Sequence, residues 1–240
     1  MRVGFVSDQG GSKKENEDSF LIDMNRGLFI VADGLGGHQS GKCASRIATE
    51  EISLYLKNIS ITGKNAESAL EQSILNANSV IARAAEADPE WRADMGTTVV
   101  VALIIDGRFL ISNVGDSRAY RIKNGSIEQL SEDHTFVADW VKSGTITREE
   151  AWRHEARRGL WMALGVEDNV DPFFAQGDWN GDSTLVLCSD GLTDAVEDQE
   201  ILRVVKMSDD PQTACEKLLV RAKELGTRDH VTVLVICGSE

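Results

Sequence analysis

The sequence lacks the features that mark membrane, secreted and nucleic-acid-binding proteins. No apolar run approaches the roughly 20 residues needed to cross a bilayer, and the first residues enter a strand-like pattern without an apolar leader segment. The four cysteines form no CxxC pair, which indicates reduced thiols in a cytoplasmic protein. The net charge of −14 disfavours nucleic-acid partners and anionic membranes, because phosphate binding requires clustered lysine and arginine. We therefore expect a cytoplasmic protein with no nucleic-acid partner and no membrane insertion.

Few features of the sequence mark a boundary between domains. It contains only three prolines, no internal repeat and no low-complexity segment. A length of 240 residues favours one domain, and a hydrophobic fraction of 42% suffices for a sizeable core. We expect a single domain over residues 1–240 that acts as a monomer.

The apolar patterns indicate both strands and helices. Two helical patterns, at 44–56 and 66–84, predict an antiparallel helix pair. Asp106-Gly107 and Asn124-Gly125 each lie between strand-like runs, so we expect an antiparallel meander over 97–130. A further helix is expected at 211–225. Other short apolar runs predict strands at 3–6, 20–22, 28–32, 172–177, 184–188 and 231–237.

Hairpins imply antiparallel pairing, whereas the amphipathic helices need sheet faces to cover. The simplest arrangement is a sandwich of two sheets with helices packed outside it. A doubly wound parallel sheet would require helices between most consecutive strands, which this order of elements does not provide.

Carboxylates stand at the ends of strand-like runs. The segment LFIVADGLGG delivers Asp33 directly after a buried strand, and Asp116, Asp190 and Asp229 also lie at strand ends. Crowded carboxylates raise each other's pKa, and Mg²⁺ or Mn²⁺ relieves this by accepting their oxygens. Glycine beside such a ligand permits close approach, so Gly34 would leave room and lend its carbonyl. An ordinary Asp-Gly turn is the alternative for each position taken singly.

A second acidic segment, SDQGGSKKENEDSF, contains Glu17 and Asp18. Both could hold metal-bound waters around the ions, and Lys13 could neutralise an incoming phosphate. The alternative is an acidic turn with a solvent-facing lysine.

Seven segments together resemble the metal-dependent serine/threonine protein phosphatases of type 2C, in their compact bacterial form. The resemblance runs in order along essentially the whole chain. The segments are NEDSF at 16–20, VADGLGGH at 31–38, MGTT at 95–98, VGDSRAY at 114–120, LSEDH at 130–134, CSDGLTD at 188–194 and RDHVTV at 228–233.

The resemblance implies an α+β fold, a four-layer α/β/β/α sandwich in which helix pairs flank two central antiparallel sheets. It implies a flap at about 139–165, which carries Trp140, Trp152 and Trp161. The flap would be mobile and would select substrates.

The resemblance also implies a set of metal ligands. One ion would bind Asp33, Asp190 and Asp229. Asp33 would bridge to a second ion, which also takes the Gly34 carbonyl. Glu17 and Asp18 would act through water, and these two residues with Asp33 form the implied catalytic set. Asp116, together with Asp190, matches the position of a third and looser ion.

The implied reaction is metal-dependent hydrolysis of phosphoserine and phosphothreonine in proteins. Two tightly bound Mn²⁺ or Mg²⁺ ions acidify a bridging water, which attacks phosphorus in line as hydroxide without a phosphoenzyme. The substrates would be phosphorylated proteins, the products of a serine/threonine kinase.

The chain departs from the family pattern at three positions. Lys13 stands where the family commonly has arginine, and an ammonium cannot make the planar bidentate contact of a guanidinium. Met162 replaces an arginine often found in the flap. Leu35 replaces a histidine that animal members carry, which leaves the general acid unassigned, and His38 is a weak candidate.

Three other functions were weighed. GGHQSGKC at 36–43 imitates a nucleotide-binding P-loop, but Cys43 lacks the hydroxyl that would hold Mg²⁺. Cys215 to Arg221 spells C-x₅-R, the pattern of cysteine phosphatases, without glycines to cradle a phosphate. The third alternative is a catalytically weak phosphoprotein-binding module on the same fold.

Overall fold

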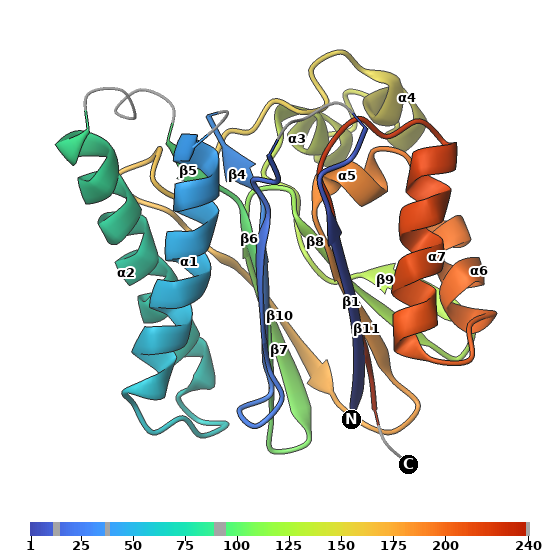
Figure 1. The fold of residues 1–240 in the computed structure, drawn as a ribbon, viewed down its shortest axis with the longest axis horizontal. Coiled ribbons are helices and arrows are strands. Elements are labelled where there is room, and N and C mark those ends of the chain that lie inside the picture. Colours follow the sequence, from blue (N-terminus) through green and yellow to red (C-terminus); the bar gives the residue numbers. More distant parts are fainter. Residues whose placement is uncertain (12–14, 37–38, 89–94, 239–240) are drawn as a thin grey trace.

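The computed structural model describes residues 1–11, 15–36, 39–88 and 95–238. Two five-stranded antiparallel sheets form its centre, and helices cover both outer faces (Figure 1). The first sheet consists, in spatial order, of β1 (Arg2–Asp8), β12 (Val231–Cys237), β11 (Thr184–Cys188), β8 (Arg118–Lys123) and β9 (Ser126–Gln129). The second consists of β10 (Phe173–Asp178), β7 (Arg108–Val114), β6 (Val99–Ile105), β3 (Leu28–Ala32) and β2 (Ser19–Asp23).

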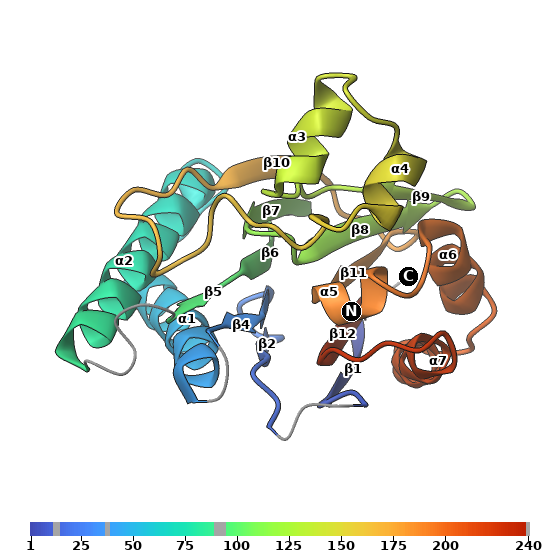
Figure 2. The same ribbon diagram turned by 90° about the horizontal axis from the view of Figure 1, so that it is seen from above.

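The helices form an outer pair on each side of the sandwich. One pair is α1 (Gln39–Lys57) and α2 (Ala66–Ala87), and the other is α6 (Asp198–Lys206) and α7 (Pro211–Glu224). Helices α3 (Phe136–Lys142) and α4 (Arg148–Arg153) contact each other and lie together at one end of the sandwich (Figure 1 and Figure 2). The short elements β4 (Gly34–Leu35), β5 (Gly96–Thr97) and α5 (Asp190–Thr193) complete one end of the sandwich. The expected four-layer α+β fold is confirmed; α6 was not expected.

Strand β3 shows why its sequence is continuously apolar. All five of its residues are buried, because alternate side chains enter different cores. Phe29 and Val31 face the core between the two sheets. Leu28, Ile30 and Ala32 face the core beneath α1 and α2. The strand is therefore held from both sides, which fixes the position of the residue that follows it, Asp33.

The two Asx-Gly signals form hairpin turns, but the expected continuous meander is wrong. Asp106 and Asn124 have positive φ angles of 51° and 52°, each followed by a glycine that also has a positive φ, as type I′ turns require. These turns join β6 to β7 and β8 to β9. Between the hairpins the chain leaves one sheet for the other at residues 115–117. A hairpin turn determines only the pairing of the two strands that it joins. The assignment of β7 and β8 to different sheets follows from packing, which buries Ile111 and Ala119 in the core between the sheets.

Candidate metal centre

Strand register brings the acidic residues to one end of the sandwich. Ala32 at the end of β3 pairs with Ser19 at the start of β2, so Asp33 and Asp18 lie next to each other. Cys188 at the end of β11 pairs with Val233 near the start of β12, which places Asp190 close to Asp229. This end lies at the top of Figure 1.

The backbone of Asp33 is fixed by two threonines of the MGTT segment. Its N–H donates to Thr98 Oγ1 at 3.1 Å, and its carbonyl accepts from Thr98 N at 2.9 Å. Thr97 Oγ1 donates to the same carbonyl at 2.8 Å. Thr98 Oγ1 also lies 2.6 Å from Ser117 Oγ, in the segment that crosses between the sheets. The side chain of Asp33 therefore projects from a rigid, buried strand end.

Asp18 is held by Ser189, the residue before Asp190. Ser189 Oγ donates to Asp18 Oδ2 at 2.8 Å and accepts from the backbone N–H of Thr232 at 3.0 Å. One potential ligand atom from each of Asp18, Asp33 and His230 lies within 4.8 Å of the other two. Among the described residues, Asp18 Oδ1, Asp190 Oδ1 and His230 Nε2 are buried without a hydrogen-bond partner. This cluster therefore offers free ligand and hydrogen-bonding atoms in its interior.

The clustered carboxyl groups have raised pKa values. Burial raises the pKa of Asp33 well above its usual range, and the charges of Asp18, Asp190 and Asp229 raise it further. Burial, with the charge of Asp229, raises the pKa of Asp190 to about 7. Burial and the charge of Asp190 likewise raise the pKa of Asp116 well above its usual range. These groups would ionise readily only beside added positive charge, so the donor set fits hard divalent cations.

Two glycines allow helix α1 to approach this cluster. A Cβ atom on Gly34 would lie 2.2 Å from the Gly41 carbonyl oxygen, and one on Gly41 would lie 2.4 Å from Glu17 Oε2. The sequence predicts that Gly34 leaves room for an ion. In the structure, the Gly41 backbone of α1 lies in the direction of the missing Cβ. The role of the Gly34 carbonyl as a ligand stays a prediction.

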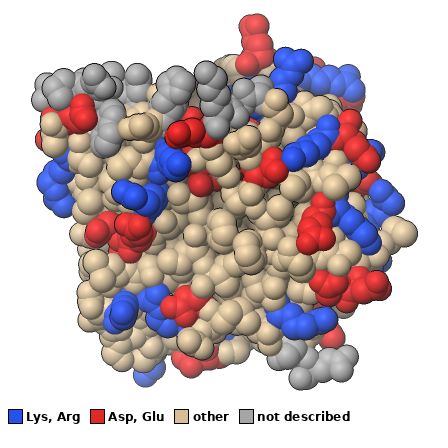
Figure 3. Space-filling view, viewed as in Figure 1, with Lys and Arg blue, Asp and Glu red and all other residues tan. Residues whose placement is uncertain are grey.

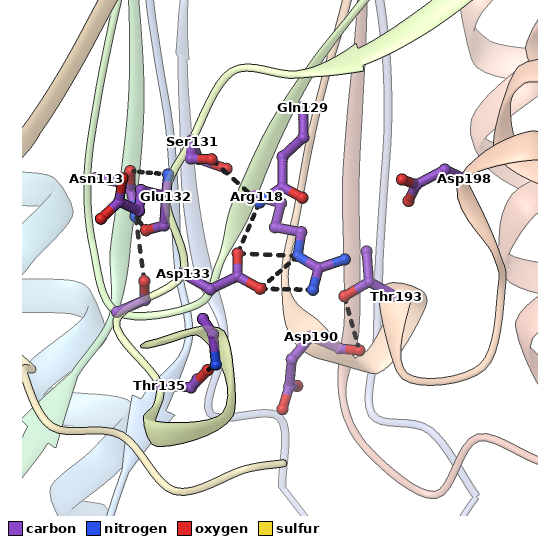
Figure 4. Close-up of polar contacts among 12 residues, drawn as sticks. Asn113, Arg118, Gln129, Ser131, Glu132, Asp133, Thr135, Asp190, Thr193 and Asp198 are labelled. Atoms are coloured by element: carbon purple, nitrogen blue, oxygen red, sulfur yellow. Dashed lines mark hydrogen bonds and ion pairs between the residues drawn. The ribbon is translucent and has the colours of Figure 1, made fainter. Parts of the chain in front are cut away.

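Asp116 lies where the chain crosses between the sheets and lines a cleft of about 860 Å³ together with Asp190. In this cleft Arg118 Nε donates to Asp133 Oδ2 at 2.9 Å (Figure 4). Arg118 Nη1 also donates to Tyr120 Oη at 3.0 Å. The Asp133 carboxylate thus compensates the Arg118 charge, which leaves the two aspartates beside the cleft available to a cation.

Arg158 contacts the cluster from the segment 139–165, which is expected to form a flap, and was not among the predicted site residues. Arg158 Nη1 donates to Asp229 Oδ2 at 3.0 Å, and Arg158 Nε donates to Asp194 Oδ2 at 2.6 Å. Other residues missed were Ser189 and His230, although each adjoins a predicted ligand in the sequence. That adjacency was the available signal, because neighbours of a buried ligand are buried with it.

The structure also locates two of the positions at which the chain departs from the family pattern. Leu35 lies in β4 and pairs with Gly96. Met162 is 6% exposed, packs in the core beneath α1 and α2, and accepts a hydrogen bond from the Asp171 backbone at Sδ. Lys13 and His38 lie outside the described residues, so the expected roles of Lys13 and His38 stay predictions.

The structure argues against the cysteine-phosphatase alternative. Cys215 is fully buried on the inner face of α7, and burial raises its pKa to about 12. Arg221 is paired with Glu200 and Glu224 on the helix surface. The nucleotide-binding alternative conflicts with the antiparallel sheets and with Asp33 at the end of β3.

The charge on the visible face is mixed. In Figure 3 the described Lys and Arg side chains are interspersed with Asp and Glu and do not gather into one broad basic patch. Over the described part of the chain, none of the helices is sufficiently long and apolar to span a membrane.

Comparison with known proteins identifies the family. The family described as Protein phosphatase 2C matches residues 11–219. The serine/threonine phosphatase stp of Listeria monocytogenes is 34% identical over 241 residues, covering 98% of this chain and 95% of the relative. PstP of Mycobacterium tuberculosis is 33% identical over 235 residues, which span 98% of this chain and 44% of that longer protein.

Solved structures agree with these matches. Serine/threonine phosphatase Stp1 from Staphylococcus aureus superimposes with a TM-score of 0.93 at 34% identity, covering 99% of this chain and 95% of the other. The catalytic domain of PstP in complex with two manganese ions gives a TM-score of 0.88 at 31% identity, covering 100% and 98%. The chain therefore belongs to the protein phosphatase 2C family of serine/threonine phosphatases, as its motifs indicated.

Proposed function

We propose that this chain hydrolyses phosphoserine and phosphothreonine in proteins with the help of divalent cations, by direct attack of water and without a phosphoenzyme. The observation that carries the proposal is the cluster of buried carboxylates with unpartnered oxygens at one end of the sandwich. Family membership supports the same reaction.

The carboxylates suit two Mn²⁺ or Mg²⁺ ions. Asp33, Asp190 and Asp229 would hold one ion, and Asp33 with the Gly34 carbonyl would hold the second. When bound, such ions make an attacking water more acidic and neutralise the phosphoryl oxygens. The manganese-bound relative supports two ions. A third at Asp116 and Asp190 is proposed from their shared place on the cleft.

The chain itself keeps the reacting groups in place. Thr97 and Thr98 fix the carbonyl of Asp33, and Ser189 orients Asp18. Asp18 and Glu17 would hold water molecules around the ions, which keeps the attacking water in line with the scissile bond. Lys13 would bind the substrate phosphate.

The two fully buried cysteines, Cys188 and Cys215, do not support a covalent route. Burial raises the pKa values of Cys188 and Cys215 to about 12, so neither is a thiolate at neutral pH. Water is therefore the better nucleophile in this site.

The proposal also covers the substrates, the oligomeric state, the location and the domain organisation of the chain. The substrates would be phosphorylated proteins made by a serine/threonine kinase, and the chain would act as a cytoplasmic monomer. Residues 1–240 would form one catalytic domain, with the flap at about 139–165 beside the cleft.

Phosphate release from a phosphothreonine peptide tests the proposal. We expect release that requires Mn²⁺, stops with EDTA and persists in a Cys215→Ala control. Tight peptide binding without release, at saturating Mn²⁺, would instead indicate a phosphoprotein-binding module.

A further inference from the structure

His230 is a buried imidazole in the carboxylate cluster to which the reaction outlined above gives no task. Its exposed fraction is 0%, and its backbone N–H donates to Asp229 Oδ1 at 2.9 Å. A Cβ atom on Gly191 would lie 1.8 Å from the His230 carbonyl oxygen. Helix α5 therefore packs directly against this residue, which fixes the backbone that carries the ring.

The hydrogen bond at one ring nitrogen determines the state of the other. The backbone N–H of Glu17 donates to His230 Nδ1 at 3.2 Å. A backbone N–H can only donate, so Nδ1 must present its lone pair. The neutral ring then carries its proton on Nε2, which becomes a hydrogen-bond donor.

That donor has no partner among the described residues, and a complementary acceptor lies in the same cluster. His230 Nε2 and Asp18 Oδ1 are both buried and both lack a hydrogen bond. One potential ligand atom of each of His230, Asp18 and Asp33 lies within 4.8 Å of the other two. Buried polar groups that cannot meet directly are commonly joined by an ordered water molecule.

We propose that His230 is a positioning residue whose Nε2–H, together with Asp18 Oδ1, holds one water molecule inside the carboxylate cluster. The water contacts a fixed donor on one side and a fixed acceptor on the other, so its orientation is set. Asp33 lies beside it, and the held water therefore aligns the solvent around the ions. Only this catalytic consequence rests on the proposed function, because the water site itself depends on the protein alone.

The same tautomer argues against direct coordination of a cation by the ring. A nitrogen that carries a proton has no lone pair to give to a metal. Coordination through Nε2 would require the proton to move to Nδ1, where it would oppose the N–H of Glu17. The structure thus favours a water donor over a metal ligand.

The first test determines the tautomer of His230 and the presence of the water in the metal-free protein. Long-range ¹H–¹⁵N NMR spectra, assigned with His230→Asn, should show His230 protonated on Nε2, and a crystal structure should place a water between Nε2 and Asp18 Oδ1. A proton on Nδ1, or a ring without this water, would overturn the proposal. So would ¹⁴N coupling from His230 in the electron paramagnetic resonance spectrum of the Mn²⁺-loaded protein.

Two variants test the hydrogen bonds of the two ring nitrogens of His230 separately. In His230→Asn the amide oxygen can still accept from Glu17, but the side chain does not reach the Nε2 position. In His230→Gln the amide N–H reaches that position, whereas the acceptor for Glu17 is lost. Since one hydrogen bond is at stake, we expect kcat to fall roughly three- to tenfold in the asparagine variant, with KM little changed.

The glutamine variant should recover part of that loss. Full activity in His230→Asn with low activity in His230→Gln would show that the ring only anchors Glu17, and would overturn the proposal. Equal activity in all three proteins would do the same. If the wild type releases no phosphate, the proposed function fails, and the NMR and crystallographic measurements still decide the water site.

Discussion

Asp190 and Asp229 lie close together in the carboxylate cluster, where each is proposed to bind a cation. Burial and the charge of Asp229 disfavour the ionised form of Asp190 and raise its pKa to about 7. The same oxygens are the ligands that a divalent cation prefers. At the scale of the residue, a buried carboxylate that destabilises the metal-free protein is therefore also a favourable ligand for a divalent cation.

Substitution of either aspartate separates these effects. We expect Asp190→Asn or Asp229→Asn to lower kcat/KM by at least about 100-fold, because an ionic ligand is lost. The metal-free Asp190→Asn variant should be no less stable than the wild type, since one buried charge is removed. Phosphopeptide turnover and thermal unfolding in EDTA measure the two effects.

Asp182→Asn, at an exposed position, is the matched control. Normal turnover in Asp190→Asn or Asp229→Asn would remove the metal assignment. A collapsed fold in both would show that these carboxylates serve structure as well as chemistry.

At the scale of elements, the site depends on how closely α1 approaches β4. Gly34 and Gly41 face each other at this contact, and Glu17 lies against Gly41. An alanine in a helix ordinarily stabilises it by about 1 kcal/mol relative to glycine. Here the added methyl group meets both a side chain and a backbone atom, so the steric effect should win.

We therefore expect Gly41→Ala to destabilise the protein by about 1–3 kcal/mol and to impair turnover. The new Cβ would lie 2.4 Å from Glu17 Oε2 and 2.9 Å from the Gly34 carbonyl carbon. The first contact can yield by side-chain rotation, whereas the second requires the helix or β4 to move. Urea unfolding and phosphate release measure the outcome, with exposed Glu50→Ala in the same helix as the control. A more stable and fully active Gly41→Ala variant would contradict this account.

The segment 139–165, proposed as a flap, is attached more firmly at its C-terminal end than along α3 and α4. Leu164 N donates to Thr97 O at 2.9 Å, and Trp161 N donates to His134 O at 3.0 Å. Leu164 is fully buried, whereas Trp152 in α4 is 40% exposed. These contacts predict a rigid anchor at 160–165 and easier local opening around α4.

Hydrogen–deuterium exchange measures this difference. The amides of Trp161 and Leu164 should exchange slowly, and those of α4 should exchange early. Slow exchange throughout 139–165 would contradict a mobile flap, and rapid exchange at Leu164 would contradict the anchor.

At the scale of the whole molecule, the acidic cluster couples stability to pH and to metal. The folded protein raises the pKa of Asp190 from the usual 3.8 to about 7. A raised carboxyl pKa favours the folded state below pH 4, and this contribution is lost as the pH rises through 7. Asp33 and Asp116 are shifted in the same direction.

We therefore expect the metal-free protein to become less stable between pH 5 and pH 7.5. Mn²⁺ should raise Tm more at pH 7.5 than at pH 5, because the ion replaces the protons. Thermal unfolding in EDTA and in Mn²⁺ at both pH values checks the sign. Asp190→Asn should flatten the pH dependence, and rising metal-free stability towards pH 7.5 would contradict the assigned shifts.

The local elements and the candidate acidic residues could be recognised from the order of amino acids alone. Apolar periodicity and Asx-Gly turns act over a few residues, so the strands of the two main sheets, helices α1, α2 and α7 and the two hairpins were predictable. Asp33, Asp116, Asp190 and Asp229 stood out because each adjoins a strand-like run. The order of seven family motifs then implied both the fold and the reaction.

The way in which these elements pack against one another depends on contacts between residues that are distant in the chain. Burial between the sheets separates β7 from β8, although the sequence between them reads as one meander. Ser189, Arg158 and His230 contact Asp18, Asp229 and Glu17 across 171, 71 and 213 residues of sequence. Local patterns cannot encode such contacts, because register and packing of distant strands bring the partners together.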